Sequence, residues 1–127
     1  AEISNYLENK LLDHVLRNTS YTSPTTVYVG LYTSNPDEGN TGTEVSGGSY
    51  ARQSLSVTTA SGGVVTSSAD VTFPQATASW GTISHIGLLD ALTSGNLLMY
   101  TALTTSKAIE SGDVLKIASG SLTASID

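Results

Sequence analysis

The residue types that could do chemistry in this chain are two histidines, a serine and a few carboxylates. Ser84, His85 and Asp90 are the types of a nucleophile, a base and an orienting acid. Neighbouring residues on a β-strand point to opposite faces, so we expect Ser84 and His85 not to hydrogen-bond to each other. His14 stands beside Asp13, with no second histidine or cysteine at metal-ligand spacing. We therefore predict no catalytic residue, no metal site and no cofactor, and interpret both histidines as structural or interfacial.

A long segment from 34 to 49, rich in glycine and asparagine, carries three more carboxylates. Asp37, Glu38 and Glu44 could offer oxygen ligands to Ca²⁺, but the alternating ligand order of an EF-hand is absent. We favour a solvated acidic loop and keep a cation site as the alternative. Because long loops in compact domains are often functional, we predict that these three residues and Tyr50 contact a partner.

The aromatic residues allow three interpretations. Six tyrosines and the single tryptophan, Trp80, could pack the core, lie in a subunit interface or line a sugar site. We favour core packing over an interface, and either of these over a glycan site.

Composition restricts the partners. The chain has 127 residues, no cysteine, 13% charged residues and a formal net charge of −6. Five Lys and Arg residues cannot form the basic surface that nucleic acid or an anionic membrane would require. We expect a single domain over residues 1–127. The start, Ala1-Glu2-Ile3, has no basic or apolar leader region, so we expect a cytoplasmic product that has lost its initiator methionine.

The amphipathic periodicity of residues 4 to 17 predicts a helix. Leu7, Leu11 and Val15 recur every fourth residue on one face. This helix could pack over its own domain, which we favour. Alternatively, residues 1–18 could form an arm that docks on a partner subunit, and those three apolar residues would then be its contacts.

The remaining residues, 26–127, are predicted to form an antiparallel β-sandwich, so the fold class is mainly β with one N-terminal helix. About eight strands follow one another at the short spacing of sandwiches and barrels. The centre should be a hairpin from Trp80 to Leu103, because both of its arms are apolar on two faces. We expect a turn at 104–106, and a last hairpin that joins 114–117 to 122–126. The other expected strands are 26–33, 51–58, 64–66 and 69–73.

Several stretches, in the same order along nearly the whole chain, resemble a family of small virion proteins of tailed bacteriophages, whose members are often labelled structural or tail fibre proteins. The resemblance rests on Ser4-Asn5-Tyr6-Leu7-Glu8-Asn9-Lys10-Leu11-Leu12-Asp13-His14, Thr43-Glu44-Val45-Ser46-Gly47-Gly48-Ser49-Tyr50-Ala51-Arg52, Val71-Thr72-Phe73-Pro74, Ala78-Ser79-Trp80-Gly81-Thr82-Ile83-Ser84-His85-Ile86-Gly87, Gly95-Asn96-Leu97-Leu98, Leu103-Thr104-Thr105-Ser106-Lys107 and Ser111-Gly112-Asp113. One departure is Leu88-Leu89, where an aromatic residue is expected.

The resemblance implies a non-enzymatic virion component that is assembled in the host cytoplasm. Scarce charge and abundant Ser and Thr fit a surface covered by neighbouring subunits, so we expect a homo-oligomer, for instance a trimer. Our main expectation is a capsid decoration (cement) subunit that binds the major capsid protein and stabilises the shell. The alternative is a tail fibre, adaptor or tail-tip subunit that binds other tail proteins and could contact host glycans. An enzyme such as a glycan hydrolase is the least favoured class.

Overall fold

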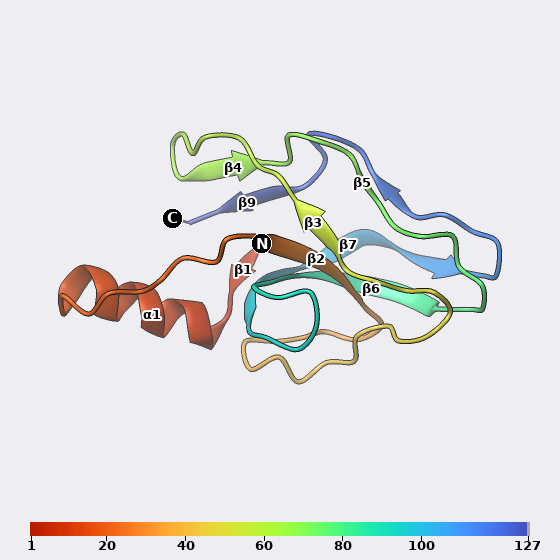
Figure 1. Cartoon of the computed structure of the whole chain (residues 1–127), viewed down its shortest axis with the longest axis horizontal. Coiled ribbons are helices and arrows are strands. Elements are labelled where there is room, and N and C mark those ends of the chain that lie inside the picture. The colour runs from red at the N-terminus through yellow and green to blue at the C-terminus, as the bar shows by residue number, and fades with distance from the viewer. Residues whose placement is uncertain (127) are drawn as a thin grey trace.

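The computed structural model describes residues 1–126, which form one helix and nine strands (Figure 1). In chain order the elements are β1 (Glu2–Ile3), α1 (Asn5–Leu16), β2 (Val27–Tyr32), β3 (Gln53–Leu55), β4 (Val64–Thr66), β5 (Val71–Thr72), β6 (Gly81–Leu89), β7 (Leu97–Ile109), β8 (Lys116–Ile117) and β9 (Thr123–Ser125). Within the described residues, no helix is both long and apolar enough to cross a membrane.

The first layer is a five-stranded antiparallel sheet in the order β1-β7-β6-β2-β3. The β6–β7 hairpin provides its longest pairing, and β6 lies at its centre, as the two-sided apolar pattern predicts. Asp90 fixes the hairpin turn: its carboxylate accepts hydrogen bonds from the backbone N and the Nδ2 of Asn96, at 2.7 and 3.1 Å. Ser94 and Gly95 take the positive φ values that this turn requires.

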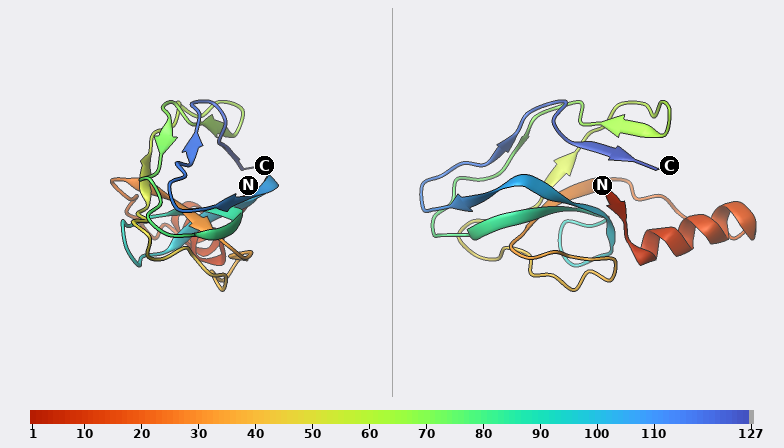
Figure 2. Two further views of the ribbon diagram at one scale, coloured as in Figure 1. Left: turned by 90° about the vertical axis from the view of Figure 1, so that its right-hand side faces the viewer. Right: turned by 180° about the vertical axis from the view of Figure 1, so that it is seen from behind.

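The second layer consists of two short antiparallel ribbons, β4 with β9 and β5 with β8. It faces the large sheet across the core, so the molecule is a β-sandwich with an N-terminal helix (Figures 1 and 2). The predicted last hairpin is wrong, because β8 and β9 pair with β5 and β4 instead of each other. The turn residues at 118–120 are present, but they connect two ribbons, and local turn chemistry cannot show which strand a segment will pair with.

The strand β7 also differs from the prediction. It continues to Ile109 without the turn expected at 104–106. Ile83 pairs with Lys107 and His85 with Ala102, so a bulge of β7 opposite Ser84 absorbs the residues between them. The polar run Thr-Thr-Ser therefore marks a bulge in a strand, and not the end of the strand.

Both faces of the large sheet are covered, but by different material. On one side Val29, Leu31, Ile86 and Leu98 pack with Phe73 and other residues of the interlayer core. On the other side lies a smaller cluster of Tyr32, Leu89, Leu97 and Tyr100. The loop 34–49 runs beneath the sheet, on the side away from the second layer (Figure 1). The long loop therefore covers the face of the large sheet that the second layer does not cover.

Candidate functional site

Ser84 and His85, the pair nearest to a catalytic arrangement, do hydrogen-bond to each other, contrary to the prediction. Ser84 Oγ lies 2.8 Å from His85 Nδ1. The strand alternation that should separate them is broken at this point by the register shift between Ile83 and His85.

Asp90, the acid that the sequence offers to this pair, does not orient it. The carboxylate of Asp90 is bound to Asn96 in the hairpin turn, so it cannot serve the imidazole. Among residues 1–126 there is also no group of three or more His, Asp or Glu residues that could hold a metal ion. In the part of the chain that the structure describes, the pair is therefore a serine–histidine contact in β6, opposite the bulge of β7, without triad geometry.

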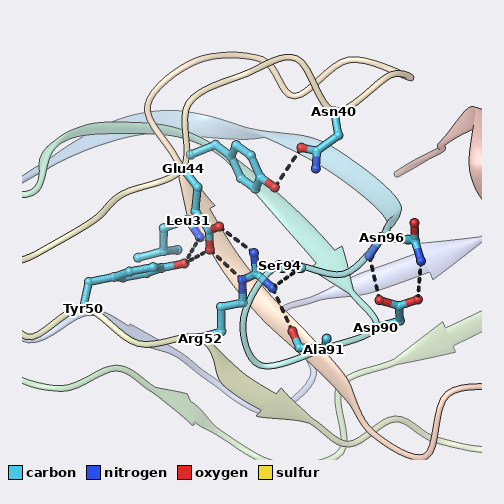
Figure 3. Close-up of polar contacts among 10 residues, drawn as sticks. Leu31, Asn40, Glu44, Tyr50, Arg52, Asp90, Ala91, Ser94 and Asn96 are labelled. Carbon is cyan, nitrogen blue, oxygen red and sulfur yellow. Dashed lines mark hydrogen bonds and ion pairs between the residues drawn. The ribbon is translucent and has the colours of Figure 1, made fainter.

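A polar cluster formed by Glu44, Tyr50 and Arg52 joins the loop to the sheet (Figure 3). The guanidinium of Arg52 binds the Glu44 carboxylate at two points, with Nη2 2.7 Å from Oε1 and Nε 2.8 Å from Oε2. Its Nη1 donates to the carbonyl oxygens of Ala91 and Ser94, both at 2.8 Å, in the β6–β7 turn. The hydroxyl of Tyr50 donates to Glu44 and accepts from the backbone N of Leu31. We call these three side chains the loop anchor.

The loop anchor fits against β2 because residue 30 is glycine. A Cβ on Gly30 would lie 2.9 Å from Glu44 Oε2 and 3.3 Å from Tyr50 Oη. Sequence reasoning missed Arg52 and Gly30, although both carry a signal. Arg52 is the single cationic residue between Arg17 and Lys107, and a glycine inside an apolar strand indicates a close approach.

Burial of the loop anchor changes its proton affinities. Burial and the hydrogen bond to Glu44 both raise the pKa of Tyr50 well above its usual range. Burial and the nearby charge of Glu44 raise the pKa of Tyr32 to about 12. The side chains of Arg52 and Glu44 are 9% and 21% exposed, so their ion pair is largely withdrawn from water. Glu44 and Tyr50, both predicted partner contacts, are bound within their own chain.

The two other loop carboxylates, Asp37 and Glu38, lie at the exposed tip of the loop. Backbone turns shape the tip: Asp37 has a φ of 57°, and its carboxylate accepts from the Glu38 backbone N at 2.9 Å. The Glu38 carbonyl then accepts from the backbone N of Asn5 at 3.0 Å, at the start of α1. The backbone of the loop tip thus contacts the first residue of α1, while the carboxylates of Asp37 and Glu38 remain on the surface.

The helix α1 is joined to the sandwich mainly through its first turn. Ser4 is the N-cap: its Oγ accepts from the Leu7 backbone N at 3.2 Å and donates to the Leu97 carbonyl of β7. Beyond this root the helix projects away from the two layers (Figures 1 and 2). None of its residues is buried. The helix contacts its own domain through its first turn, where Tyr6 and Leu7 pack against the core. The docking of this arm on a partner subunit stays a prediction.

The arm is covered on its polar side alone. The segment 18–24 returns along α1, where the backbone N of Tyr21 donates to His14 Nδ1 at 3.2 Å. The ring of Tyr21 also meets that of Tyr6 edge to face, at 6.4 Å between centroids. The apolar side has no such cover: Leu12, Val15 and Leu16 are 55%, 71% and 74% exposed. Of the predicted contacts on this face, Val15 is fully available, whereas Leu7 and Leu11 are half-buried.

An apolar groove opens between the two layers close to the arm. Its volume is about 530 Å³, and Leu7 of the helix forms part of its wall with Leu55, Val57, Leu98, Met99 and Leu122. Among the described residues, no charged side chain lines it. A groove of this size and composition suits apolar side chains better than a polar ligand.

The single tryptophan, Trp80, belongs to the core. Trp80 is 4% exposed, and its Nε1 donates to the Gly48 carbonyl at 2.8 Å. Its ring meets that of Tyr50 edge to face at 5.5 Å, while Tyr50 stacks on Phe73 at 6.2 Å. The face of Trp80 is thus occupied and does not offer a platform for a sugar.

These features define a class: a β-sandwich protein with a projecting N-terminal helix and an apolar groove between its two layers. The profile of the family described as Gp80, podophage GP4 fiber I protein gp80, matches residues 2–125, and the chain belongs to this family. The resemblance to tailed-phage structural and fibre proteins is thereby confirmed, and the protein is a virion component. A comparison with curated proteins gave no match.

Proposed function

We propose that the protein is a non-enzymatic subunit of a bacteriophage tail fibre. The observation that carries this proposal is the family match, which spans residues 2–125 and names a fibre protein. It supports the alternative among our expectations better than the capsid decoration subunit that we placed first. That Asp90 does not orient Ser84 and His85 supports a structural role over a hydrolytic one.

The structure supplies what such a subunit needs. The ion pair of Glu44 and Arg52 holds the loop 34–49 against the sandwich, and the arm offers an apolar surface for assembly. Fibre subunits contact one another and the phage tail in a fixed geometry. A projecting helix suits such contacts better than a disordered chain segment, because less conformational entropy is lost on binding.

The location of the protein on the virion tests this proposal. Gold-labelled antibody against the protein should mark the tail region in electron micrographs of intact particles. Its copy number should also be far below that of the major capsid protein. Labelling spread over the shell, at a copy number comparable to that of the capsid protein, would overturn the fibre proposal and restore the decoration subunit.

A further inference from the structure

Half of the eight large aliphatic side chains that are exposed among residues 1–126 lie on α1 or at the groove, and the other four are Val64, Leu92, Val114 and Ile126. Leu12, Val15 and Leu16 lie on the outer half of α1, and Val57, 45% exposed, lies at the groove. Large aliphatic groups on a rigid surface indicate a site that another molecule covers. The return segment 18–24 contacts the polar side of the arm through Tyr21 and leaves the apolar side free.

One side of α1 continues the wall of the groove. Leu7 lines the groove, and Leu11 and Val15 follow it along the same side of α1, one turn apart. A second copy presents the same pair of features, so each copy carries both a projecting apolar helix face and an uncharged apolar groove.

We propose that the apolar face of α1 in one copy packs into the interlayer groove of a second copy. This inference rests on the proposed function as a fibre subunit, and it identifies the contact by which such subunits associate. In a closed dimer or trimer, every copy both donates its arm and receives one.

Charge favours this pairing over contact between two sandwich bodies. Residues 5–17 contain two acidic residues, Glu8 and Asp13, and two basic residues, Lys10 and Arg17. The arm is therefore neutral, and the formal charge of −6 resides in the rest of the chain. Two acidic bodies repel each other, whereas a neutral arm can approach a groove without charged lining at no such cost.

The size of the contact favours a second copy over an unrelated partner. A helix of 12 residues is about 18 Å long, so one insertion covers less than the ~800 Å² per partner of a standard interface. An unrelated partner would gain one such insertion, while exchange between copies gives each copy two. Reciprocal docking therefore buries twice the area of a single insertion and uses no surface besides the arm and the groove.

Engineered cysteines test this geometry directly, because the natural chain has none. One full-length variant carries Val15→Cys on the arm, and a second carries Val57→Cys at the groove. We expect the mixture to form a disulfide-linked heterodimer on mild oxidation, faster than either variant alone. Lys10→Cys, on the side of α1 opposite Leu12, Val15 and Leu16, is the matched control and should cross-link poorly to Val57→Cys.

Sedimentation of the unmodified chain gives the second readout. It should show concentration-dependent association, and the Val15→Ser/Leu16→Ser variant should associate at least tenfold more weakly. The control Lys10→Gln, on the opposite side of α1, should associate normally. A chain that stays monomeric, or Val15→Cys copies that cross-link to each other faster than to Val57→Cys, would overturn the inference.

The two proposals fail in different ways. If the chain is monomeric in solution but the antibody still marks the tail, the exchange of arms is rejected and the assignment as a fibre subunit is kept. If the copies exchange arms but the antibody marks the capsid shell, the contact between copies is kept and the assignment as a fibre subunit is rejected.

Discussion

The loop 34–49 and the helix α1 are both long surface features, and their side chains are arranged in opposite ways. The loop carries charge, yet its Glu44 points inward to Arg52 and Tyr50. The helix carries aliphatic residues, yet Leu12, Val15 and Leu16 point outward. Polar groups are thus satisfied within the chain at the loop, and apolar groups are left uncovered on the arm.

This difference separates stability from assembly. A half-buried carboxylate without a partner would be costly, so the loop anchor has to be complete in the isolated chain. Exposed aliphatic residues cost the isolated chain little, and they acquire a stabilising role when another molecule covers them. We therefore expect substitutions in the loop anchor to destabilise the fold and substitutions on the apolar face of α1 to leave the fold unchanged.

Removal of the cation from the loop anchor should have the largest effect. Arg52→Ala leaves the Glu44 carboxylate without its partner and frees the Ala91 and Ser94 carbonyls. We expect the free energy of unfolding to fall by about 3 kcal/mol, the lower end of the range for breaking a buried ion pair, because Glu44 keeps some exposure. Urea unfolding followed by tryptophan fluorescence measures this loss.

The matched control is Arg17→Ala on the arm. Arg17 pairs with Asp13 at 3.1 Å, but their side chains are 71% and 41% exposed. Its removal should change the free energy of unfolding by less than about 0.5 kcal/mol. Equal losses for the two arginine variants would contradict the distinction between loop and arm.

Removal of the Tyr50 hydroxyl should have the next largest effect. Tyr50→Phe keeps the ring stacked on Phe73 but leaves the Leu31 backbone N and the Glu44 carboxylate each with one bond fewer. At neutral pH we expect a loss of about 1–2 kcal/mol in the free energy of unfolding, measured by urea titration.

The pH dependence of the same variant follows from the raised pKa of Tyr50. The contribution of a group with a raised pKa is complete below its unfolded value, about 10 for tyrosine, and declines as the pH rises above that value. The natural chain should therefore lose stability above pH ~10, whereas Tyr50→Phe should lose less. The difference in melting temperature between the two proteins should shrink with rising pH, and a constant difference would contradict this account.

The fold class could be predicted from the sequence because its main signals are local. The period of α1, the two-sided apolar pattern of β6 and β7, and their turn at Gly95 all act over a few residues. The pairing of β8 with β5 and of β9 with β4 could not be predicted in this way. Those ribbons are two or three residues long and join segments far apart in the chain.

The candidate site was predicted in part, for a related reason. The periodicity showed which residues of α1 share a face, but not whether the sandwich would cover that face. The sheet itself bonds the helix at Ser4 alone, so α1 leaves at an angle that its own sequence does not encode. Glu44 was read as a loop carboxylate because its partner, Arg52, lies eight residues away across an irregular segment.

The junction between arm and body should show an intermediate effect. Ser4 is buried, and its hydroxyl both caps α1 and bonds β7. Ser4→Ala should lower the free energy of unfolding by about 1 kcal/mol and loosen the arm more than the sheet. Hydrogen exchange should therefore accelerate over residues 5–16 and remain unchanged over β6. A uniform acceleration over both regions would show that the arm and the body unfold as one unit.

The smallest effect on stability is expected at the apolar face of α1, although the substitution there is drastic. Val15→Ser/Leu16→Ser removes two large aliphatic groups, but both side chains are more than two-thirds exposed in the single chain. At dilutions where the protein is monomeric, the free energy of unfolding should change by less than about 0.5 kcal/mol, as measured by urea titration. A loss of 2 kcal/mol or more, typical of a buried aliphatic residue, would mean that the chain itself covers this face in solution. A loss that appears with rising protein concentration would instead come from the contact between copies, because association stabilises the folded state by mass action.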